Sequence, residues 1–301
     1  MTTLIPPRVE RPAGRPSRLL RAGPPLTASY VLSAVVLVLM VVQSVLGLAV
    51  EGLYPEQTWA VAALRGNDLV TLILVAPALA AVLVLSRRRP STASVPIWLG
   101  LLFCGVYNFA YYAYGAAFSD VFLLHVTAYS LSMIGLILLG ASIDAPRVAQ
   151  GVARDRRTRV VAVFTTLVGL ALIGAWGGLS LRFAVTGELP KDVMPPSAVH
   201  LVYALDMGVL APAFAIAGAL LWRRVPWGAV MAVAINASGA AYLTVLEFVG
   251  CFQADAGIDR RTWASPTAIG AVLLCLAATV ALLLPPRKTI TEEASHVHGP
   301  S

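Results

Sequence analysis

Charged residues are scarce in this sequence. Of its 301 residues only 12% are charged, whereas 58% are hydrophobic. Soluble domains usually carry about 25% charged residues, and a water-soluble fold would not bury so much apolar surface. The apolar residues fall into blocks of roughly 18 to 25, which is the length that crosses a hydrocarbon core about 30 Å thick. The composition therefore predicts an all-α, polytopic membrane protein that has the lipid bilayer as its surroundings.

Catalytic signatures are missing as well. The apolar blocks contain no HExxH zinc motif, and the chain has no GxSxG elbow, P-loop or GxGxxG turn. Its three cysteines, Cys104, Cys251 and Cys275, match neither a metal-ligand spacing nor a CxxC pair. No motif favours hydrolytic or nucleotide-driven chemistry, so the sequence assigns neither an enzymatic activity nor a cofactor.

Eight apolar blocks predict eight spans. They lie at about residues 28–50, 69–86, 95–117, 119–141, 160–180, 198–222, 227–249 and 266–284. Every second connection is rich in arginine, as in Arg87 to Arg89 and Arg154 to Arg159, and the other connections carry mixed charge, as in Glu51 to Asp68. The positive-inside rule places the arginine-rich set, and with it both chain termini, in the cytoplasm. The net charge of +7 thus reflects topology, and we expect no nucleic-acid partner.

The order of the spans predicts two membrane halves. We expect a basic cytoplasmic segment at 1–27, four spans in 28–142, a basic connection at 143–159, four spans in 160–284 and a cytoplasmic tail at 285–301. Ala76-Pro77-Ala78 in the second span matches Ala211-Pro212-Ala213 in the sixth. A four-plus-four repeat with parallel halves is one explanation. Chance similarity between Ala-rich segments is the other.

Polar side chains inside the sixth span are the first candidates for a functional site. Asp206 lies about 12 Å into the span, which is too deep for a short side chain to reach the interface. His200 and Tyr203 precede it at three-residue intervals and share one side of the helix. Ionisable groups within a membrane usually mark a ligand or proton pathway. Hydrogen bonding between helices is the competing explanation.

Three further spans carry polar residues. In the seventh span, Asn236, Thr244 and Glu247 follow one face and predict a polar seam that opens outward. An interfacial carboxylate also explains Glu247, and helix packing also explains Asn236. In the third span, Tyr112 and Tyr114 fit an aromatic belt near the interface. The deeper residues Tyr107 and Asn108 need partners.

The candidate residues concentrate at one depth of the membrane. His125 in the fourth span faces the same way as Tyr129, and hydrogen bonding in the bundle is its simpler explanation. The outer halves of the spans contain nearly all of these groups, which predicts a polar cavity in the outer half of the bundle. The predicted ligand-binding or coupling residues are Asp68, Asn108, Tyr111, His125, His200, Tyr203, Asp206, Asn236 and Glu247.

Two parts of the chain resemble a known group of proteins. The stretch from Arg65 to Leu72, together with Tyr107 to Phe118, resembles bacterial multi-pass membrane proteins that have no assigned activity. The segment from His200 through Asp206 to Gly228 is similar to the later part of that family. The resemblance implies a bacterial cytoplasmic (inner) membrane and transfers no catalytic residue.

Three functions remain open at this point. The first is a small-molecule transporter or permease, favoured by the repeat, the paired prolines and the outward polar residues. The second is a membrane redox protein that holds haem or quinone between His125 and His200. The third is a non-catalytic assembly or partner-binding subunit, in which the polar groups only join helices.

Overall fold

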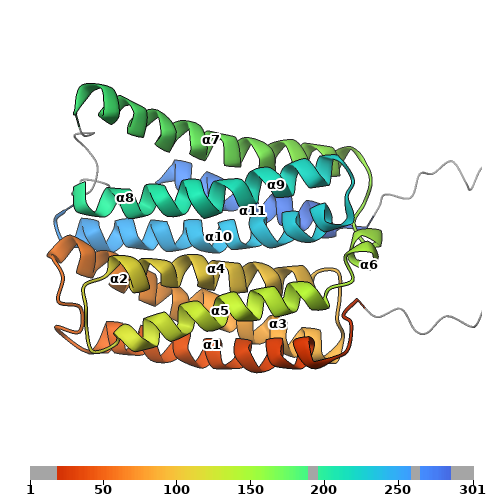
Figure 1. The fold of residues 1–301 in the computed structure, drawn as a ribbon, viewed down its shortest axis with the longest axis horizontal. Coiled ribbons are helices and arrows are strands. Elements are labelled where there is room, and N and C mark those ends of the chain that lie inside the picture. The colour runs from red at the N-terminus through yellow and green to blue at the C-terminus, as the bar shows by residue number, and fades with distance from the viewer. Residues whose placement is uncertain (1–18, 189–195, 259–264, 286–301) are drawn as a thin grey trace, which may run out of the picture.

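The computed structural model describes residues 19–188, 196–258 and 265–285. Within these residues the protein is an all-α bundle without a β-strand, and eight continuous helical stretches are long and apolar enough to cross a membrane (Figure 1). Both features confirm the prediction from composition. Two of these stretches, Thr58–Arg88 and His200–Trp222, each run through two of the helices named below. The helices are α1 (Pro24–Ala49), α2 (Thr58–Val70), α3 (Ala76–Arg88), α4 (Ser94–Gly115), α5 (Phe122–Ser142), α6 (Ala145–Gln150), α7 (Arg156–Thr186), α8 (Pro196–Leu205), α9 (Ala211–Trp222), α10 (Pro226–Asp255) and α11 (Pro266–Leu283).

Prolines begin several of these helices. Pro24 starts α1, Pro226 starts α10 and Pro266 starts α11. Proline is well suited to the first turn, where its missing N–H would have no partner and its fixed φ already matches the helix. At the far end of α7, Gly187 takes the left-handed conformation with φ 69° and ends the helix. Local sequence thus sets many of the helix boundaries.

Helices α4 and α10 form the centre of the bundle (Figure 1). Helix α4 packs on α5 and α10, and α10 also packs on α2, α9 and α11. The two backbones approach closely, because a Cβ at Gly100 of α4 would lie 2.2 Å from the carbonyl oxygen of Ala234 in α10. Only glycine permits that distance. Exposed Val, Leu and Ile side chains on the outer helices, such as Val31, Leu167 and Leu273, face the lipid.

Two spans contain a π-helical segment at the same position relative to an Ala-Pro pair. The segment η1 (Thr71–Val75) joins α2 to α3, and η2 (Asp206–Leu210) joins α8 to α9. Each ends directly before an Ala-Pro pair, at Pro77 and Pro212. Because the proline ring crowds the carbonyl four residues earlier, the backbone widens there, and the alanine N–H bonds to the residue five positions back. The matched sequence segments therefore share a backbone feature; the division into two repeated halves remains a prediction.

Several expected boundaries need correction. The second span begins at Thr58 instead of about residue 69, so Arg65 and Asp68 lie inside a helix and not in an outer connection. The fifth and seventh spans also extend further outward, to Thr186 and Asp255. Hydropathy missed these turns because their polar side chains point into the bundle or lie beyond the apolar core, while the backbone hydrogen bonding continues. Of the predicted terminal segments 1–27 and 285–301, residues 1–18 and 286–301 lie outside the described residues.

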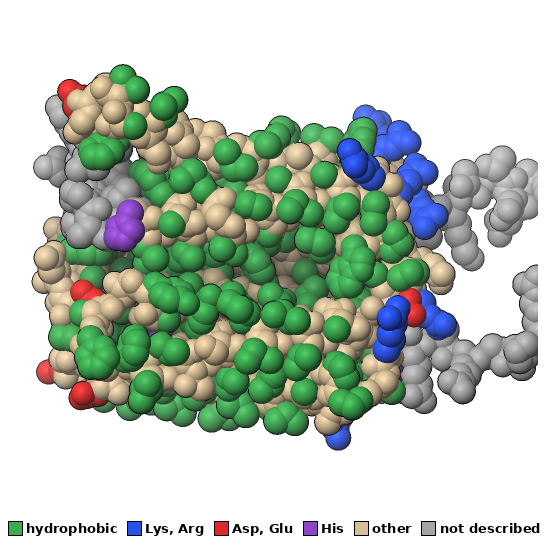
Figure 2. Space-filling model, viewed as in Figure 1, with side chains coloured by type: hydrophobic (Ala, Val, Ile, Leu, Met, Phe, Trp, Pro, Cys, Tyr) green, Lys and Arg blue, Asp and Glu red, His purple; other side chains and the backbone are tan. Residues whose placement is uncertain are grey.

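Charge is distributed unevenly along the bundle axis. The visible Lys and Arg side chains gather at one end of the molecule, where the described chain also begins and stops (Figure 2). This arginine-rich end includes Arg87, Arg156 and Arg224. Most of the visible Asp and Glu side chains, and the visible His, lie at the opposite end, which we name the outer end. The distribution agrees with the alternation of connections in the sequence, and the cytoplasmic assignment of the arginine-rich end rests on the positive-inside rule.

Candidate functional site

A cavity of about 370 Å³ opens between α2, α4, α8 and α10 at the outer end of the bundle. Most of its wall is apolar and includes Trp59, Leu64 and Leu246. Its polar lining comprises Glu56 and Gln57 before α2, and Asn67, Asn108, Tyr111, His200 and Tyr242 on the helices. Three of the nine residues predicted from the sequence, Asn108, Tyr111 and His200, therefore lie on one cavity wall.

An amide pair joins two helices at this wall. Asn67 of α2 donates through Nδ2 to Oδ1 of Asn108 in α4, with 2.7 Å between the two atoms. The hydroxyl of Thr71 donates in turn to Oδ1 of Asn67 at 3.2 Å. Asn108 thus has the partner that its depth required. The pair ties the π-helical span to the central helix next to the cavity.

Three tyrosine hydroxyls lead from the cavity to a buried carboxylate. The Tyr111 and Tyr242 hydroxyls lie 3.3 Å apart at the cavity wall. The Tyr107 hydroxyl lies 3.1 Å from that of Tyr111 and 3.4 Å from that of Tyr242. Tyr107 donates to Oδ1 of Asp206. Because a phenol can donate and accept at once, these groups form a continuous hydrogen-bonded route from the cavity to Asp206.

Asp206 lies at the first position of the π-helical segment η2, and only 4% of its surface is exposed. Its second oxygen accepts from the indole N–H of Trp176 in α7 at 2.7 Å. The Trp176 indole also stacks on the ring of Tyr203, with centroids 4.4 Å apart. Helices from both predicted halves therefore meet at this carboxylate, which is the candidate that sequence reasoning placed first.

The three residues that share one side of the sixth span have different surroundings. His200 is exposed and lines the cavity. Tyr203 is buried against α7, and its hydroxyl has no hydrogen-bond partner in the described part of the chain. Asp206 faces Tyr107 and Trp176. Residues spaced three apart shift gradually around the helix, so His200, Tyr203 and Asp206 face different neighbours and do not converge on one ligand.

A second buried carboxylate, Asp68, lies in α2 and is fully enclosed. Three side chains donate to it: Gln43 of α1, Tyr54 at 2.7 Å and Tyr112 of α4 at 2.9 Å. Tyr54 belongs to the outer connection, where burial, followed by the negative charge of Asp68, raises the pKa of its hydroxyl. Tyr54 therefore stays protonated and keeps donating. Asp68 does not line the outer cavity.

His125 lies beside this enclosed cluster. Its ring packs 4.7 Å from that of Tyr112, and 1% of its surface is exposed. Nε2 of His125 has no hydrogen-bond partner among the described residues. His200, by contrast, lines the cavity, and His125 does not. Among the described residues, the two histidines therefore do not line the same cavity. The haem or quinone hypothesis needs a site that both of them share, and the described structure has none.

The polar residues of α10 make contacts away from the cavity. Asn236 is fully buried and donates to Thr165 of α7 at 3.0 Å. Thr244 donates to the carbonyl of its own helix at Ala240. Glu247 accepts from the backbone N–H of Ser265 at 2.9 Å. The residues of α10 that line the cavity are instead Tyr242, Val245, Leu246 and Val249.

Sequence reasoning missed most of the hydrogen-bond donors around the carboxylates. Tyr112 is 1% exposed and donates to Asp68, so its assignment to an aromatic belt is wrong; Tyr114, which is 65% exposed, fits that assignment. Tyr107 and Tyr112 are five residues apart, or about 140° around a helix. Helix α4 therefore provides one hydroxyl donor for each carboxylate, Tyr107 for Asp206 and Tyr112 for Asp68. This spacing was a usable signal, whereas nothing in the sequence marked Gln43 or Trp176.

No protein-family model, curated protein or solved structure matches the chain. The resemblance to bacterial multi-pass proteins therefore rests on the short segments named above. In the described residues, no group of three or more His, Cys, Asp and Glu side chains is arranged to hold a metal ion. What the site offers chemically is an apolar cavity linked by hydroxyl groups to a carboxylate.

Proposed function

We propose that this membrane protein is a transporter for a small, largely apolar molecule, which binds in the outer cavity. The observation that carries the proposal is the route from the cavity wall through Tyr111 and Tyr107 to Asp206. A carboxylate inside the membrane is costly to maintain, and such groups often mark proton pathways in transporters. Here it is connected through hydroxyl groups to polar residues of a mostly apolar cavity wall, which favours coupling between ligand and proton.

The cavity lining indicates the class of ligand. Its volume of about 370 Å³ lies near the lower end of the range for small-molecule sites. Aromatic and aliphatic side chains form most of the wall, and hydrogen bonds join the Asn67 and Asn108 amides to each other and the Tyr111 hydroxyl to that of Tyr242. This lining fits a mostly apolar molecule with one or two hydrogen-bonding groups, such as a phenol or an aromatic amide.

The coupling step uses the tyrosines as a relay. When Asp206 is ionised it accepts bonds from Tyr107 and Trp176. A proton that arrives through Tyr111 or Tyr242 would neutralise the carboxylate and weaken both bonds. Because Asp206 opens the π-helical segment, where the backbone hydrogen bonding is already irregular, the change would act on the joint between α8 and α9. Transport then follows from a shift of this joint relative to α7.

The proposed setting is the cytoplasmic membrane of a bacterium, with the arginine-rich end in the cytoplasm. The cavity would then face the outside. If the two halves are repeated and parallel, Asp206 opens η2 at the position that corresponds to Thr71, and Asp68 lies three residues before η1. Only the Asp206 side retains a connection to the cavity, which favours one working site and one structural site.

Transport can be tested in proteoliposomes that enclose a pH-sensitive dye. A panel of neutral phenols and aromatic amides of about 200 to 350 Da, matched to the size of the cavity, is added outside, and native mass spectrometry records binding to the same protein. At least one compound is expected to bind and to move protons. Asp206→Asn should retain binding and lose proton movement.

A pair of substitutions tests the location of the site. Ala63 lines the cavity, and Ala63→Phe should fill it and abolish binding of any compound that the wild type binds. Ala175, on the exposed face of α7, provides the matched control, since Ala175→Phe should leave binding intact. Binding that persists in Ala63→Phe would exclude the cavity. Proton movement that persists in Asp206→Asn would exclude that carboxylate as the coupling group.

The enclosed cluster at Asp68 favours a second function, that of a non-catalytic membrane subunit. Its donors come from α1, α4 and the outer connection, so its hydrogen bonds serve to join helices. This function predicts a stoichiometric partner in gentle detergent. It also predicts that neutralising Asp206 changes neither partner recovery nor any proton movement.

A further inference from the structure

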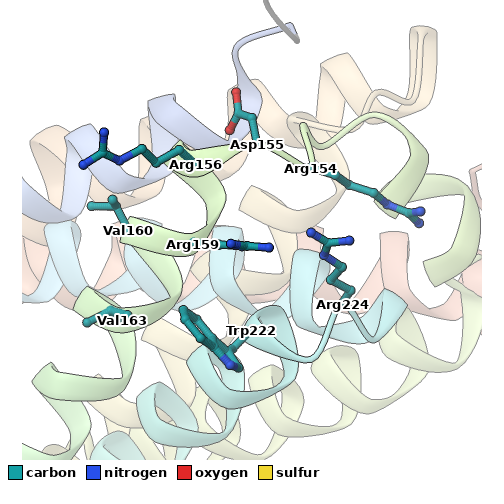
Figure 3. A pocket seen from close by; sticks show the side chains of 8 residues that line it. All are labelled: Arg154, Asp155, Arg156, Arg159, Val160, Val163, Trp222 and Arg224. Atoms are coloured by element: carbon teal, nitrogen blue, oxygen red, sulfur yellow. The ribbon is translucent and has the colours of Figure 1, made fainter.

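A second cleft lies at the arginine-rich end, far from the outer cavity. It has a volume of about 700 Å³ and lies between the start of α7 and the end of α9 (Figure 3). Four arginines and one aspartate line it together with Val160, Val163 and Trp222. The charged residues are Arg154, Asp155, Arg156, Arg159 and Arg224. Nothing in the proposed transport mechanism uses this cleft.

The one carboxylate in the cleft already has partners. Asp155 pairs with Arg157 at 2.7 Å and accepts from the backbone N–H groups at the start of α7. Arg157 does not line the cleft. Among the described residues, no carboxylate lies within ion-pair distance of Arg159 or Arg224. The lining therefore carries a surplus of positive charge.

Two of these arginines face each other. Figure 3 shows the guanidinium ends of Arg159 and Arg224 pointing toward one another, with the Trp222 indole beside them, while Arg154 and Asp155 point elsewhere. Like charges that converge in a cleft repel, and the repulsion is greater where the surroundings are less polar. An anion placed between the two groups would remove it. Guanidinium groups bind phosphate through two parallel hydrogen bonds, so phosphate suits this geometry.

The backbone conformation of Arg224 is unusual, which supports a binding role for its side chain. Helix α9 ends in a Schellman motif, with Val225 N–H bonded to Leu220 O and Arg224 N–H to Leu221 O. Arg224 occupies the left-handed position with φ 58° and is the only described non-glycine residue with positive φ. Glycine is favoured there because other residues are strained. The chain places an arginine instead, and its side chain enters the cleft.

The apolar part of the cleft extends toward the membrane interior. Val163 lies about 4.5 Å further along α7 than Val160, at helical rise. Val160 is 61% exposed and Trp222 is 56% exposed, so both have surface available for a ligand. A binding surface that is cationic near the interface and apolar below it complements a phospholipid, whose phosphate adjoins its acyl chains. A free phosphate ion would leave the apolar wall unused.

We propose that this cleft binds an anionic phospholipid, with the headgroup phosphate between Arg159 and Arg224 and an acyl chain along Val160, Val163 and Trp222. The lipid would hold the start of α7 against the end of α9. Lipid binding at this end is independent of ligand transport through the outer cavity. Failure of either proposal leaves the other intact.

The test uses the full chain in detergent and phospholipids with brominated acyl chains, which quench nearby tryptophans. Brominated phosphatidylglycerol is compared with brominated phosphatidylcholine, and the signal lost in Trp222→Phe identifies quenching at the cleft. Phosphatidylglycerol is expected to quench at about tenfold lower lipid fraction, because phosphatidylcholine has the same phosphate but its choline cation neutralises the headgroup and is repelled by the arginines. The double variant Arg159→Gln with Arg224→Gln should lose this preference.

Two further variants separate the site from general surface charge and from folding. Arg223 is adjacent in sequence and does not line the cleft, so Arg223→Gln should keep the preference. Arg224→Gly suits the left-handed backbone, so it should reduce the preference without lowering the melting temperature. Equal quenching by the two lipids in the wild type would overturn the proposal. A loss of the preference in Arg223→Gln as large as that in the double variant would also overturn it.

The phosphate ion itself is the remaining source of the same chemistry. Inorganic phosphate is added in a separate arm, with ionic strength matched by chloride because salt alone screens surface charge. Quenching by phosphatidylglycerol should persist at millimolar phosphate. Displacement by phosphate but not by chloride would reassign the cleft to a soluble anion and refute the lipid.

Discussion

At the scale of single residues, the two buried carboxylates differ in how they are enclosed. Asp68 accepts from three side-chain donors and has no exposed surface. Asp206 accepts from two, and one of them, Tyr107, continues through hydroxyl groups to the cavity. A buried charge requires such donors, because desolvation without them costs several kcal/mol. The connection of Asp206 to the cavity distinguishes it as the candidate for function.

Gly47 makes the enclosure of Asp68 possible. A Cβ at this position of α1 would lie 1.9 Å from Oδ2 of Asp68 and 2.4 Å from the Tyr54 hydroxyl. Gly47→Ala should therefore destabilise the protein by about 1–3 kcal/mol, the usual cost of overpacking, because the carboxylate cannot move without losing its donors. Thermal unfolding in detergent measures the effect.

A glycine in open space provides the control for that measurement. No heavy atom lies within 4 Å of a Cβ at Gly174 in α7. Gly174→Ala should leave the melting temperature unchanged or raise it, since alanine favours the helix by up to about 1 kcal/mol. If Gly47→Ala and Gly174→Ala change the melting temperature equally, the contact with Asp68 does not prevent a larger side chain at position 47.

At the scale of elements, α7 is held differently along its length. Its inner part packs on α9, where a Cβ at Gly169 would meet the carbonyl oxygen of Ala211 at 2.5 Å. Its outer part diverges from α8 in Figure 1, beyond the contacts of Trp176 with Asp206 and Tyr203. The inner part of α7 is thus closely packed, and its outer half is held by the hydrogen bond and the ring stacking of Trp176. A transporter that moves α7 relative to α8 would need such an arrangement.

Asp155 stabilises the start of α7 in a pH-dependent manner. The Arg157 side chain, and then the N–H groups of the first turn, hold the pKa of the Asp155 carboxyl below its ordinary value. Because the pKa is lower in the folded state, the ionised carboxylate stabilises the fold above about pH 4 and loses this effect as the pH falls further. Asp155→Ala should cost about 1 kcal/mol at pH 7, as loss of a helix cap does.

The substitution Asp155→Asn separates the effect of the helix cap from the effect of the carboxylate charge. Asp155→Asn keeps an oxygen that can accept from the N–H of Thr158, so its deficit should be smaller and independent of pH. Thermal unfolding of the three proteins at pH 7 and near pH 3.5 makes the comparison. If the gap between wild type and Asp155→Ala is the same at both pH values, the carboxylate charge does not contribute.

At the scale of the whole molecule, the two ends of the bundle have opposite character. Arginine gathers at one end, and the polar cavity opens at the other (Figure 2). The described chain begins at Leu19 and stops at Pro285 on the arginine-rich side, where Arg157 donates to the Pro285 carbonyl. An even number of crossings and a one-sided charge distribution are mutually consistent. Together they predict the orientation of the protein.

Single-cysteine labelling tests that orientation. After the buried native cysteines are replaced, cysteines at Glu188 and Asp255 should react with a membrane-impermeant reagent from outside, because both lie at the outer end. Cysteines at Arg88, Arg156 and Arg223 should react only after the membrane is opened. Labelling of position 156 from outside would refute both the orientation and the proposed outward-facing cavity.

Membrane residence, helical class and the number of spans were determined by the sequence itself. Hydropathy is a sum over neighbouring residues, and a lipid solvent leaves a long apolar block only the helix as a structure that satisfies its backbone. Asp206 and Asn108 were also recognisable, because a polar side chain deep in an apolar span needs a partner whatever the fold. The same local reasoning placed Asp68 in a connection, since it could not separate a polar turn of helix from a loop.

The identity of the partners was decided only by the tertiary structure. Tyr107 and Tyr112 lie on one helix, yet they donate to carboxylates on different spans. The carboxylate that each tyrosine reaches depends on how each helix is rotated and how closely the helices pack. Glycines such as Gly47 and Gly100 permit the close approaches. A sequence pattern records the faces of one helix at a time. The contacts between faces depend on all eight helices together, so the route from the cavity to Asp206 emerges only once they are packed.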